Sequence, residues 1–255
     1  MYLAGGPLFA LQSRIWCAGT EHQLEATYGR ELLGGVQVRN EAGKSTLIRF
    51  EQLSEADRNY LKYNVPPSID LDIDYSTRVL GRTEWSRDDD DTTLYTFTVS
   101  VEKKSSLPYA GRLNVELFVL GNERVIEDDS RLVLMAYRRK SFVLPEGDDV
   151  PYEFTVPEVS FNSYRAGWIL KQAAVERGKT YRGVIAAVSD SDGNLIEIEC
   201  DFKLDWITKD LPESIENLRT LYQEHPGGIE SRHFNSRFKK LSPPSIPWFQ
   251  RFHSD

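Results

Sequence analysis

Residues 14–61 read RIWCAGTEHQLEATYGRELLGGVQVRNEAGKSTLIRFEQLSEADRNYL, and their pattern of apolar and polar residues decides the fold of the first part of the chain. Short alternating runs, which are typical of half-buried strands, are separated by turns that contain glycine. The runs are 14–18, 23–32, 36–40 and 46–53, with turns at Gly19, Gly34-Gly35 and Gly43. Four short strands this close together predict a small β-barrel.

A short helix is expected to follow the fourth strand. Ser54 can accept hydrogen bonds from the first backbone N–H groups of this helix, and Asp57 can reach back to the cap. Tyr60 and Leu61 would then fold the helix onto the barrel. Pro66-Pro67 ends the helix, because proline has no N–H and forces the preceding residue out of the helical region. We therefore assign residues 12–65 to a first domain.

Several spaced elements of this domain resemble the SLA homology domain 1 family. They are Arg14-x-Trp16, Leu24-Glu25-Ala26, Val36-x-Val38-Arg39, Gly43-Lys44 and Gln52-Leu53-Ser54-x-x-Asp57-x-x-Tyr60-Leu61. The resemblance rests on the spacing of all of them rather than on one short motif. It implies an SH3-like fold and, as in eukaryotic endocytic adaptors of the family, a surface that recognises Asn-Pro-Phe-x-Asp peptides.

Three basic residues are candidates for binding an acidic peptide. Strand alternation turns Arg39 and Arg49 away from the predicted core, and Lys44 lies in the turn between their strands. Together they could form a basic patch that pairs with a ligand carboxylate. They could equally be solvated charges, because scattered surface Lys and Arg are normal. Trp16 and Tyr60 could form an aromatic floor for a bound phenylalanine, although we expect them to belong to the core.

Residues 68–206 predict an antiparallel β-sandwich. Long alternating runs follow one another without an intervening helical period, which is typical of this architecture. The runs are 69–80, 94–101, 113–120, 132–137, 152–159, 181–188 and 195–206. Between the last two, Asp190 to Asn194 predicts a tight hairpin turn, because its Asp-Gly step favours the positive φ values that such turns require.

The C-terminal part predicts one helix and a tail. The helix opens at Pro212-Glu213, carries Ile215, Leu218 and Tyr222 on one side, and ends at Pro226-Gly227-Gly228. We expect it to pack on the sandwich, so that residues 68–228 form one domain. The tail, residues 229–255, mixes basic and aromatic residues and is expected to be poorly ordered. The fold class is thus mainly β: a small SH3-like β-barrel followed by an antiparallel β-sandwich with a C-terminal helix.

Composition bears on the partners of the chain. Its 31 Lys and Arg against 39 Asp and Glu give a net charge of −8, which argues against a nucleic-acid partner because such binding needs clustered positive charge. No apolar run approaches the roughly 18 residues that span a bilayer, so no membrane span is expected. Cys17 and Cys200 lie in different domains, and we expect two buried free thiols rather than a disulfide.

The first eleven residues resemble the end of a signal peptide. Tyr2 to Ala10 form a small apolar block with Gly and Pro, but no basic segment precedes it. Residues 1–11 are therefore either an incomplete signal-peptide remnant or a disordered lead. The first reading predicts a periplasmic or extracellular protein, and a cytoplasmic location stays open.

The sequence contains no local signature of an enzyme or a cofactor site. Ala42 to Thr46 resembles the end of a phosphate-binding loop, but Val38 stands where that loop needs glycine. The acidic runs 88–91, 127–129 and 146–149 could supply oxygens to Ca²⁺ if their loops clustered, yet solvated loop charge is the better explanation. No Gly-x-Ser-x-Gly, His-Glu-x-x-His or Cys-x-x-Cys motif occurs. We expect no catalytic residue, no metal and no cofactor.

Three functions follow as hypotheses. The first is a non-enzymatic, exported protein that binds a protein or peptide segment through the barrel. The second is a carbohydrate- or surface-binding sandwich that stacks sugars on aromatic rings, with Trp85, Tyr95, Tyr164 and Trp168 as candidates. The third is a hydrolase with a site between the two domains, where close carboxylates or a histidine with a carboxylate partner would meet.

Overall fold

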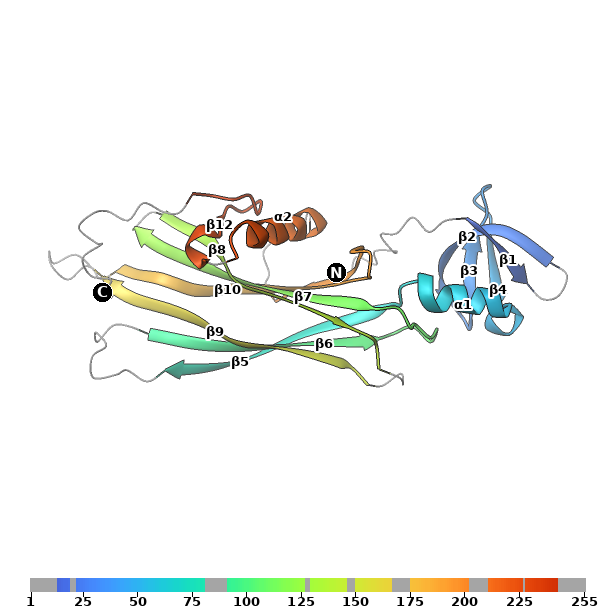
Figure 1. Ribbon diagram of the computed structural model, residues 1–255, viewed down its shortest axis with the longest axis horizontal. Helices are drawn as coiled ribbons and strands as arrows, with labels where there is room; N and C mark the ends of the chain where they lie inside the picture. The colour runs from blue at the N-terminus through green and yellow to red at the C-terminus, as the bar shows by residue number, and fades with distance from the viewer. Residues whose placement is uncertain are drawn as a thin grey trace.

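A computed structural model describes residues 13–18, 22–80, 91–126, 129–145, 150–166, 175–201, 211–226 and 228–242. The chain is mainly β, with one sheet of four strands, one of eight strands and two α-helices in the described ranges (Figure 1). The predicted fold class is therefore confirmed. The prediction for residues 1–11 lies outside the described residues.

The N-terminal unit, residues 13–65, contains the four-stranded sheet. Its strands pair antiparallel in chain order. They are β1 (Arg14–Ala18), β2 (His22–Leu32), β3 (Gly35–Arg39) and β4 (Ser45–Arg49), followed by the short helix η1 (Phe50–Gln52) and by α1 (Glu55–Asn64). The helix predicted after Ser54 is thus present, and Leu61 on it packs with Trp16, Val36, Val38 and Ile48 in one buried cluster.

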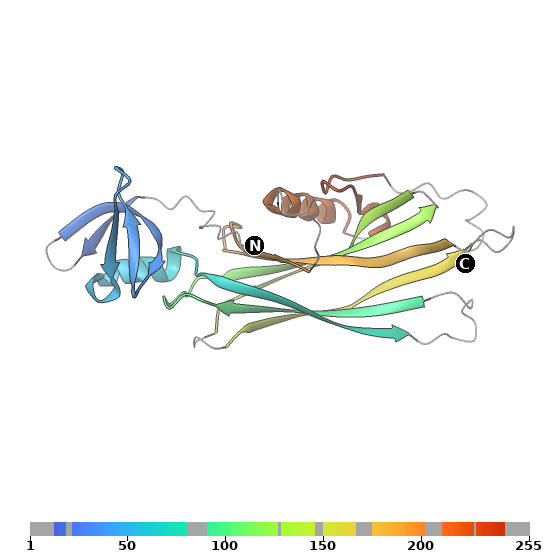
Figure 2. The same cartoon turned by 180° about the vertical axis from the view of Figure 1, so that it is seen from behind.

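The remaining strands form the eight-stranded sheet, which runs antiparallel in the order β12-β8-β7-β10-β9-β6-β5, with β11 beside β10. They are β5 (Ile69–Leu80), β6 (Asp91–Lys103), β7 (Leu113–Ile126), β8 (Asp129–Phe142), β9 (Tyr152–Ala166), β10 (Val175–Ser189), β11 (Leu195–Cys200) and β12 (His233–Phe234). Because β9 pairs with β10 only over Val175 to Gly178, the sheet folds over into two layers. Figure 2 shows these layers face to face.

The main core lies between the two layers. Inward residues of six strands form one buried cluster, which includes Leu71, Phe97, Val115, Phe154 and Val184. The predicted hairpin between β10 and β11 is confirmed, with Gly193 at φ 91° in the turn. A glycine is favoured there because other residues are strained at positive φ.

Helix α2 (Leu211–Glu224) covers the outer face of β7, β8 and β10 (Figure 1). Its Ile215, Leu218 and Leu221 are buried against Phe118 and Ile185 of the sheet. This second apolar cluster confirms the predicted C-terminal helix and its packing on the sandwich.

The prediction of a poorly ordered tail is wrong for residues 229–242. This stretch contains the short helix η3 (Ile229–Ser231) and β12, which pairs with β8. Phe234 and Phe238 are buried and stacked. Arg232 donates from Nε to the carbonyl of His225 at 2.7 Å and from Nη2 to that of Pro226 at 2.6 Å, so it satisfies carbonyls just beyond the end of α2. Basic and aromatic residues that suggested poor order instead cap the helix, through Arg232, and pack in its apolar cluster, through Phe234 and Phe238.

The loop between β6 and β7 connects the N-terminal unit to the sandwich. Leu107 in this loop packs against the core of the N-terminal unit, and the N–H of Ala110 donates to the carbonyl of Lys62 at 2.9 Å. The N–H of Ser106 donates to Oε1 of Glu31 on β2 at 3.1 Å. These contacts join residues far apart in sequence. They hold the N-terminal unit to the sandwich in addition to the covalent connection at Pro66-Pro67.

Two smaller expectations concern cysteines and membranes. Cys17 and Cys200 are both free thiols, as expected, and both are half-buried rather than fully buried. Burial raises the pKa of the Cys200 thiol to about 12. No helix in the described parts of the chain is long and apolar enough to cross a membrane.

Candidate functional site

Arg14, Ser54 and Asp57, three polar residues of the motif that resembles SLA homology domain 1, form a structural network. Asp57 is 1% exposed, and its carboxylate accepts from Arg14 at 2.8 Å, from the backbone N–H of Cys17 at 3.0 Å and from the hydroxyl of Ser54 at 2.7 Å. The backbone N–H of Asp57 in turn donates to Ser54, the cap of α1. These three residues therefore fasten α1 to β1, and their polar groups are occupied within the fold.

The structure separates the predicted aromatic floor from the predicted basic patch. Trp16 is 0% exposed and its indole N–H donates to the carbonyl of Ala26 at 2.9 Å, so it belongs to the core. Tyr60 is half-buried and lies edge-on to Trp16, with the guanidinium of Arg14 4.1 Å from its ring centre. Both rings lie on the core side of the sheet, whereas Arg39 is exposed on the other face.

Arg39 and Arg49 share the outer face of the N-terminal sheet. Arg39 is opposite Ser45 and Arg49 is opposite Gly35, so the two lie four residues apart along the β3–β4 hairpin. At about 3.3 Å per residue, their Cα atoms are roughly 13 Å apart. Lys44 is exposed in the turn beyond Arg39, where its backbone N–H donates to Asn40. The three predicted residues are thus spread along the hairpin rather than gathered at one point.

Arg30 is a further member of this face that sequence analysis missed. Leu24, Ala26 and Tyr28 alternate toward the core, which would turn Arg30 inward as well. A β-bulge at Gly29 shifts the register, so that Tyr28 is opposite Val38 and Arg30 is opposite Gln37. Arg30 is consequently exposed and donates from Nε to the side chain of Gln37 at 3.0 Å. An isolated glycine inside a strand pattern is the signal that could have revealed the bulge.

We call Arg30, Arg39, Arg49 and Leu47 the basic face. Leu47 lies on the same side of β4 as Arg49, next to Gln37, and is 42% exposed. Within the described residues, no carboxylate forms an ion pair with any of the three arginines. The face therefore combines unpaired positive charge with one exposed apolar side chain.

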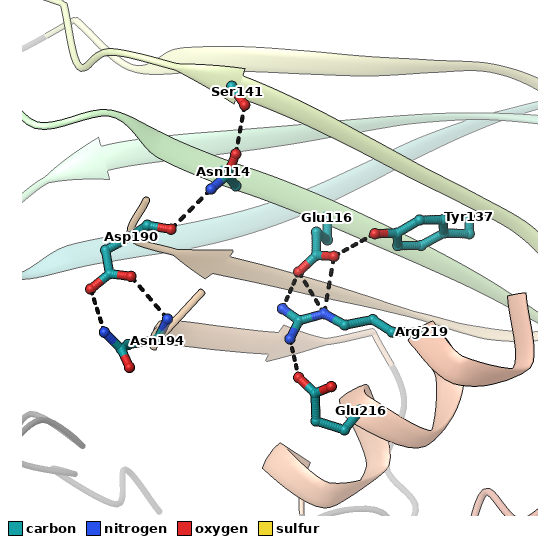
Figure 3. Close-up of polar contacts among 8 residues, drawn as sticks. All are labelled: Asn114, Glu116, Tyr137, Ser141, Asp190, Asn194, Glu216 and Arg219. Atoms are coloured by element: carbon teal, nitrogen blue, oxygen red, sulfur yellow. Dashed lines mark hydrogen bonds and ion pairs between the residues drawn. The ribbon is translucent and has the colours of Figure 1, made fainter. Parts of the chain in front are cut away.

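A buried ion pair lies under α2 (Figure 3). Glu116 on β7 is 0% exposed, and Nε of Arg219 donates to both of its carboxylate oxygens at 3.1 Å. Arg219 also pairs with Glu216 on its own helix, and the hydroxyl of Tyr137 donates to Glu116. Burial, followed by this hydrogen bond, raises the pKa of Tyr137 well above its usual range. Because every charge here is paired within the chain, the cluster anchors α2 to the sheet.

The carboxylate of Asp190, next to this cluster, is hydrogen-bonded within its own hairpin (Figure 3). Oδ1 of Asp190 accepts from the N–H groups of Asp192 and Asn194, both at 2.9 Å, and Oδ2 accepts from the side chain of Asn194 at 2.8 Å. Its carbonyl accepts from Asn114. No group of three or more metal-ligating side chains occurs in the described ranges. Residues 88–90, 127–128 and 146–149, which carry most of the acidic runs, lie outside those ranges.

A histidine with a carboxylate partner is present, but it does not lie between the two domains. His233 on β12 is 1% exposed and pairs with Glu123 on β7, whose other oxygen lies 3.3 Å from Nζ of Lys179 on β10. All three residues belong to the sandwich. Burial of His233 denies it direct contact with a substrate, so the arrangement is that of a clamp that holds β12 to β7.

The His233–Glu123 clamp predicts a pH-dependent contribution to stability. Burial alone would raise the pKa of Glu123, but the hydrogen bond from His233 and the charge of Lys179 hold it below 4.5. The stabilisation is therefore present above this value and is lost as the pH falls through the lower pKa of the folded state. We expect Glu123→Gln to lower the free energy of unfolding by about 1–3 kcal/mol at pH 7. Urea denaturation of both proteins should show this difference shrinking as the pH is lowered below 4.5. A difference that does not change with pH would contradict the assignment.

The candidate sugar-stacking residues that the structure describes do not form one platform. Tyr95 points inward, where it stacks on Tyr181 at 4.7 Å between ring centres and packs against the main core. Tyr164 on β9 is 41% exposed. Since Phe161 and Val159 of β9 are core residues, alternation turns Tyr164 to the outer face. Trp85 and Trp168 lie outside the described residues.

Comparison with known proteins adds little. No family model matches the chain, and no curated protein matches it. A solved structure described as a crystal structure from Akkermansia muciniphila matches with 14% sequence identity, over 57% of this chain and 78% of that chain, at a TM-score of 0.24. A similarity this slight carries no argument about function.

Proposed function

We propose that this chain is a non-enzymatic binding protein that recognises an acidic peptide segment of a partner protein on the basic face. The observation that carries the proposal is the set of three exposed guanidinium groups around Leu47 with no counter-charge from the described parts of the chain. The resemblance to SLA homology domain 1 supports it, because that resemblance implies peptide recognition.

The chemistry of the basic face specifies the kind of peptide. A guanidinium group presents a planar set of donors that matches a carboxylate in a bidentate way. Arg39 and Arg49 lie roughly 13 Å apart, which an extended peptide covers in about four residues. Two acidic residues with that separation, and an apolar residue between them over Leu47, would meet all parts of the face.

Selection from a random peptide library displayed on phage tests this proposal on the full chain. We expect recovered peptides to carry two acidic residues that flank an apolar one. The triple variant Arg30→Ser, Arg39→Ser and Arg49→Ser should bind a recovered peptide more than tenfold more weakly, since each lost charged hydrogen bond costs about 1.5–3 kcal/mol. Higher salt should weaken the wild-type interaction, because the charges are exposed.

A matched control removes the same charge elsewhere. Arg138, Lys140 and Arg182 are exposed on the sandwich, and replacing all three with serine should leave peptide binding unchanged. Selection that enriches no acidic peptide, or equal loss of binding in both triple variants, would refute the proposal.

The two alternatives have less support. Sugar stacking would need aromatic rings on one exposed face, whereas Tyr95 and Tyr164 point to opposite sides of their sheet. Hydrolysis at the His233–Glu123 pair would need an accessible base, whereas His233 is 1% exposed.

A further inference from the structure

The far half of β5 is an exposed sheet edge. β5 is the last strand in the sheet order and pairs with β6 along its whole length. Its opposite edge is flanked by β11 near Asp70 and Asp72, whose charges act on Glu199 of β11. Further along, Asp74 to Leu80 are exposed at every position, and within the described residues no strand pairs with that edge. Both ribbon views show this half of β5 at the margin of the sheet, away from the N-terminal unit (Figures 1 and 2).

This edge carries apolar side chains that a monomer leaves in water. Tyr75 is 47% exposed, Val79 is 65% exposed and Leu80 is 41% exposed. Tyr75 is also held in place, because its ring lies 5.6 Å from that of Tyr181 and 5.7 Å from that of Tyr95. Edge strands of soluble proteins are usually short or protected by charge, proline or a covering segment. A long edge with an oriented aromatic ring is therefore suited to pairing with another strand.

We propose that this edge pairs with the same edge of a second copy of the chain, so that two sheets join across a two-fold axis. In such a pair, β5 of one copy runs antiparallel to β5 of the other copy. Side chains of residues directly opposite each other then point to the same face of the joined sheet. A residue on the axis lies opposite itself. Only a few residues of the exposed half can lie on the two-fold axis. The side chains that each choice places opposite each other determine which register is favourable.

Thr77 is the residue that fits the axis. Centring the pair on Arg78 would place two like charges opposite each other, which is unfavourable. Centring it on Ser76 would place Asp72 opposite Leu80 of the second copy. That part of the edge is flanked by β11, so a second copy could not pair there. Centring it on Thr77 places Tyr75 opposite Val79 of the second copy, twice, and Ser76 opposite Arg78, twice. Pairs of an aromatic and a β-branched residue are among the favourable cross-strand contacts, and this register covers the two most exposed apolar residues of the edge.

The resulting dimer is weak and places the binding units far apart. Seven residues per copy, Asp74 to Leu80, bury less surface than a standard stable interface, so we expect dimerisation at high micromolar concentration or above. Because the paired halves of β5 point away from the N-terminal unit, the two basic faces lie at opposite ends of the dimer. The inference stands independently of what those faces bind.

Sedimentation velocity over a range of about 0.01 to 1 mM tests the association. We expect a concentration-dependent monomer–dimer equilibrium for the wild type and at least a tenfold weaker one for Val79→Lys. Val143→Lys is the matched control, because Val143 is 52% exposed in the segment that follows β8. A wild type that stays monomeric at every concentration, or equal weakening by both lysine variants, would overturn the proposal.

Disulfide trapping tests the register in a background that lacks both native thiols, Cys17→Ser and Cys200→Ser. Thr77→Cys should form a covalent dimer, because the two introduced thiols lie directly opposite each other at a Cβ separation of about 4.5–5.5 Å. Asp74→Cys lies on the same edge but is opposite Leu80 of the second copy, so its two thiols are about 20 Å apart and should not cross-link. Cross-linking of Asp74→Cys in preference to Thr77→Cys would show that this pairing is wrong.

Discussion

Replacing Arg219 with methionine is expected to lower the free energy of unfolding by about 3–5 kcal/mol. The variant removes the positive partner of Glu116, whose side chain is 0% exposed and would remain as an unpaired carboxylate beneath α2. The cost comes from that stranded charge, because burying an unpaired ion is far more unfavourable than burying a paired one. Urea denaturation at pH 7, followed by far-ultraviolet circular dichroism, measures the change.

Two further variants separate this cause from loss of packing. Adding Glu116→Gln to Arg219→Met removes the charge and leaves an amide oxygen that can accept from Tyr137, so the double variant should recover at least half of the lost stability. Arg78→Met breaks the ion pair with Glu158, in which the side chains are 63% and 49% exposed, and should cost less than about 1 kcal/mol. Equal losses for Arg219→Met and Arg78→Met would contradict the role of the buried pair.

Asp57→Ala is expected to destabilise the N-terminal unit by about 3 kcal/mol. The carboxylate of Asp57 receives hydrogen bonds from Arg14, Ser54 and the backbone of Cys17, and alanine offers no acceptor in its place. The N–H of Cys17 would be left without an acceptor and α1 would lose its attachment to β1. Hydrogen exchange of residues 14–17 and 55–64 should become faster, because local opening requires less free energy.

Glu55→Ala is the matched control for that variant. Glu55 lies in the same first turn of α1 but is exposed. Its loss should cost no more than about 1 kcal/mol, the usual contribution of an acidic residue to the positive end of a helix. If Asp57→Ala changed exchange no more than Glu55→Ala, the motif residues would be free for a role in binding.

Apolar alternation predicted most of the fold from the sequence. Residues 69–80 were predicted as a strand and form β5 with the same bounds. Strands β6 to β10 are longer than predicted, whereas β4 and β11 end earlier than predicted. Strand β10 begins at Val175 rather than at residue 181. The added part carries Arg177 and Lys179, which are half-buried and polar. Alternation fails to detect them because it depends on contrast between apolar and polar positions.

The buried ion pair and the basic face depend on contacts between residues far apart in sequence and on a β-bulge, and the alternation of apolar and polar residues predicts neither. Glu116 stands in a run of apolar residues and reads as a solvated strand position, yet its partner Arg219 lies 103 residues away on α2. Arg30 points outward only because Gly29 bulges the strand. The proposed basic face therefore could be predicted only in part, through Arg39 and Arg49.

Leu107 has a practical consequence for anyone who wishes to excise the N-terminal unit. A fragment that stops at Val65 follows the boundary suggested by the two prolines, but it leaves behind a side chain that packs in the unit's own core and the loop amides that bond to Glu31 and Lys62. Such a fragment would expose an apolar surface that the whole chain covers, so expression trials are better based on the full chain. The N-terminal unit is continuous in sequence up to Val65, but its packing is complete only when the loop residues 106–110 are present.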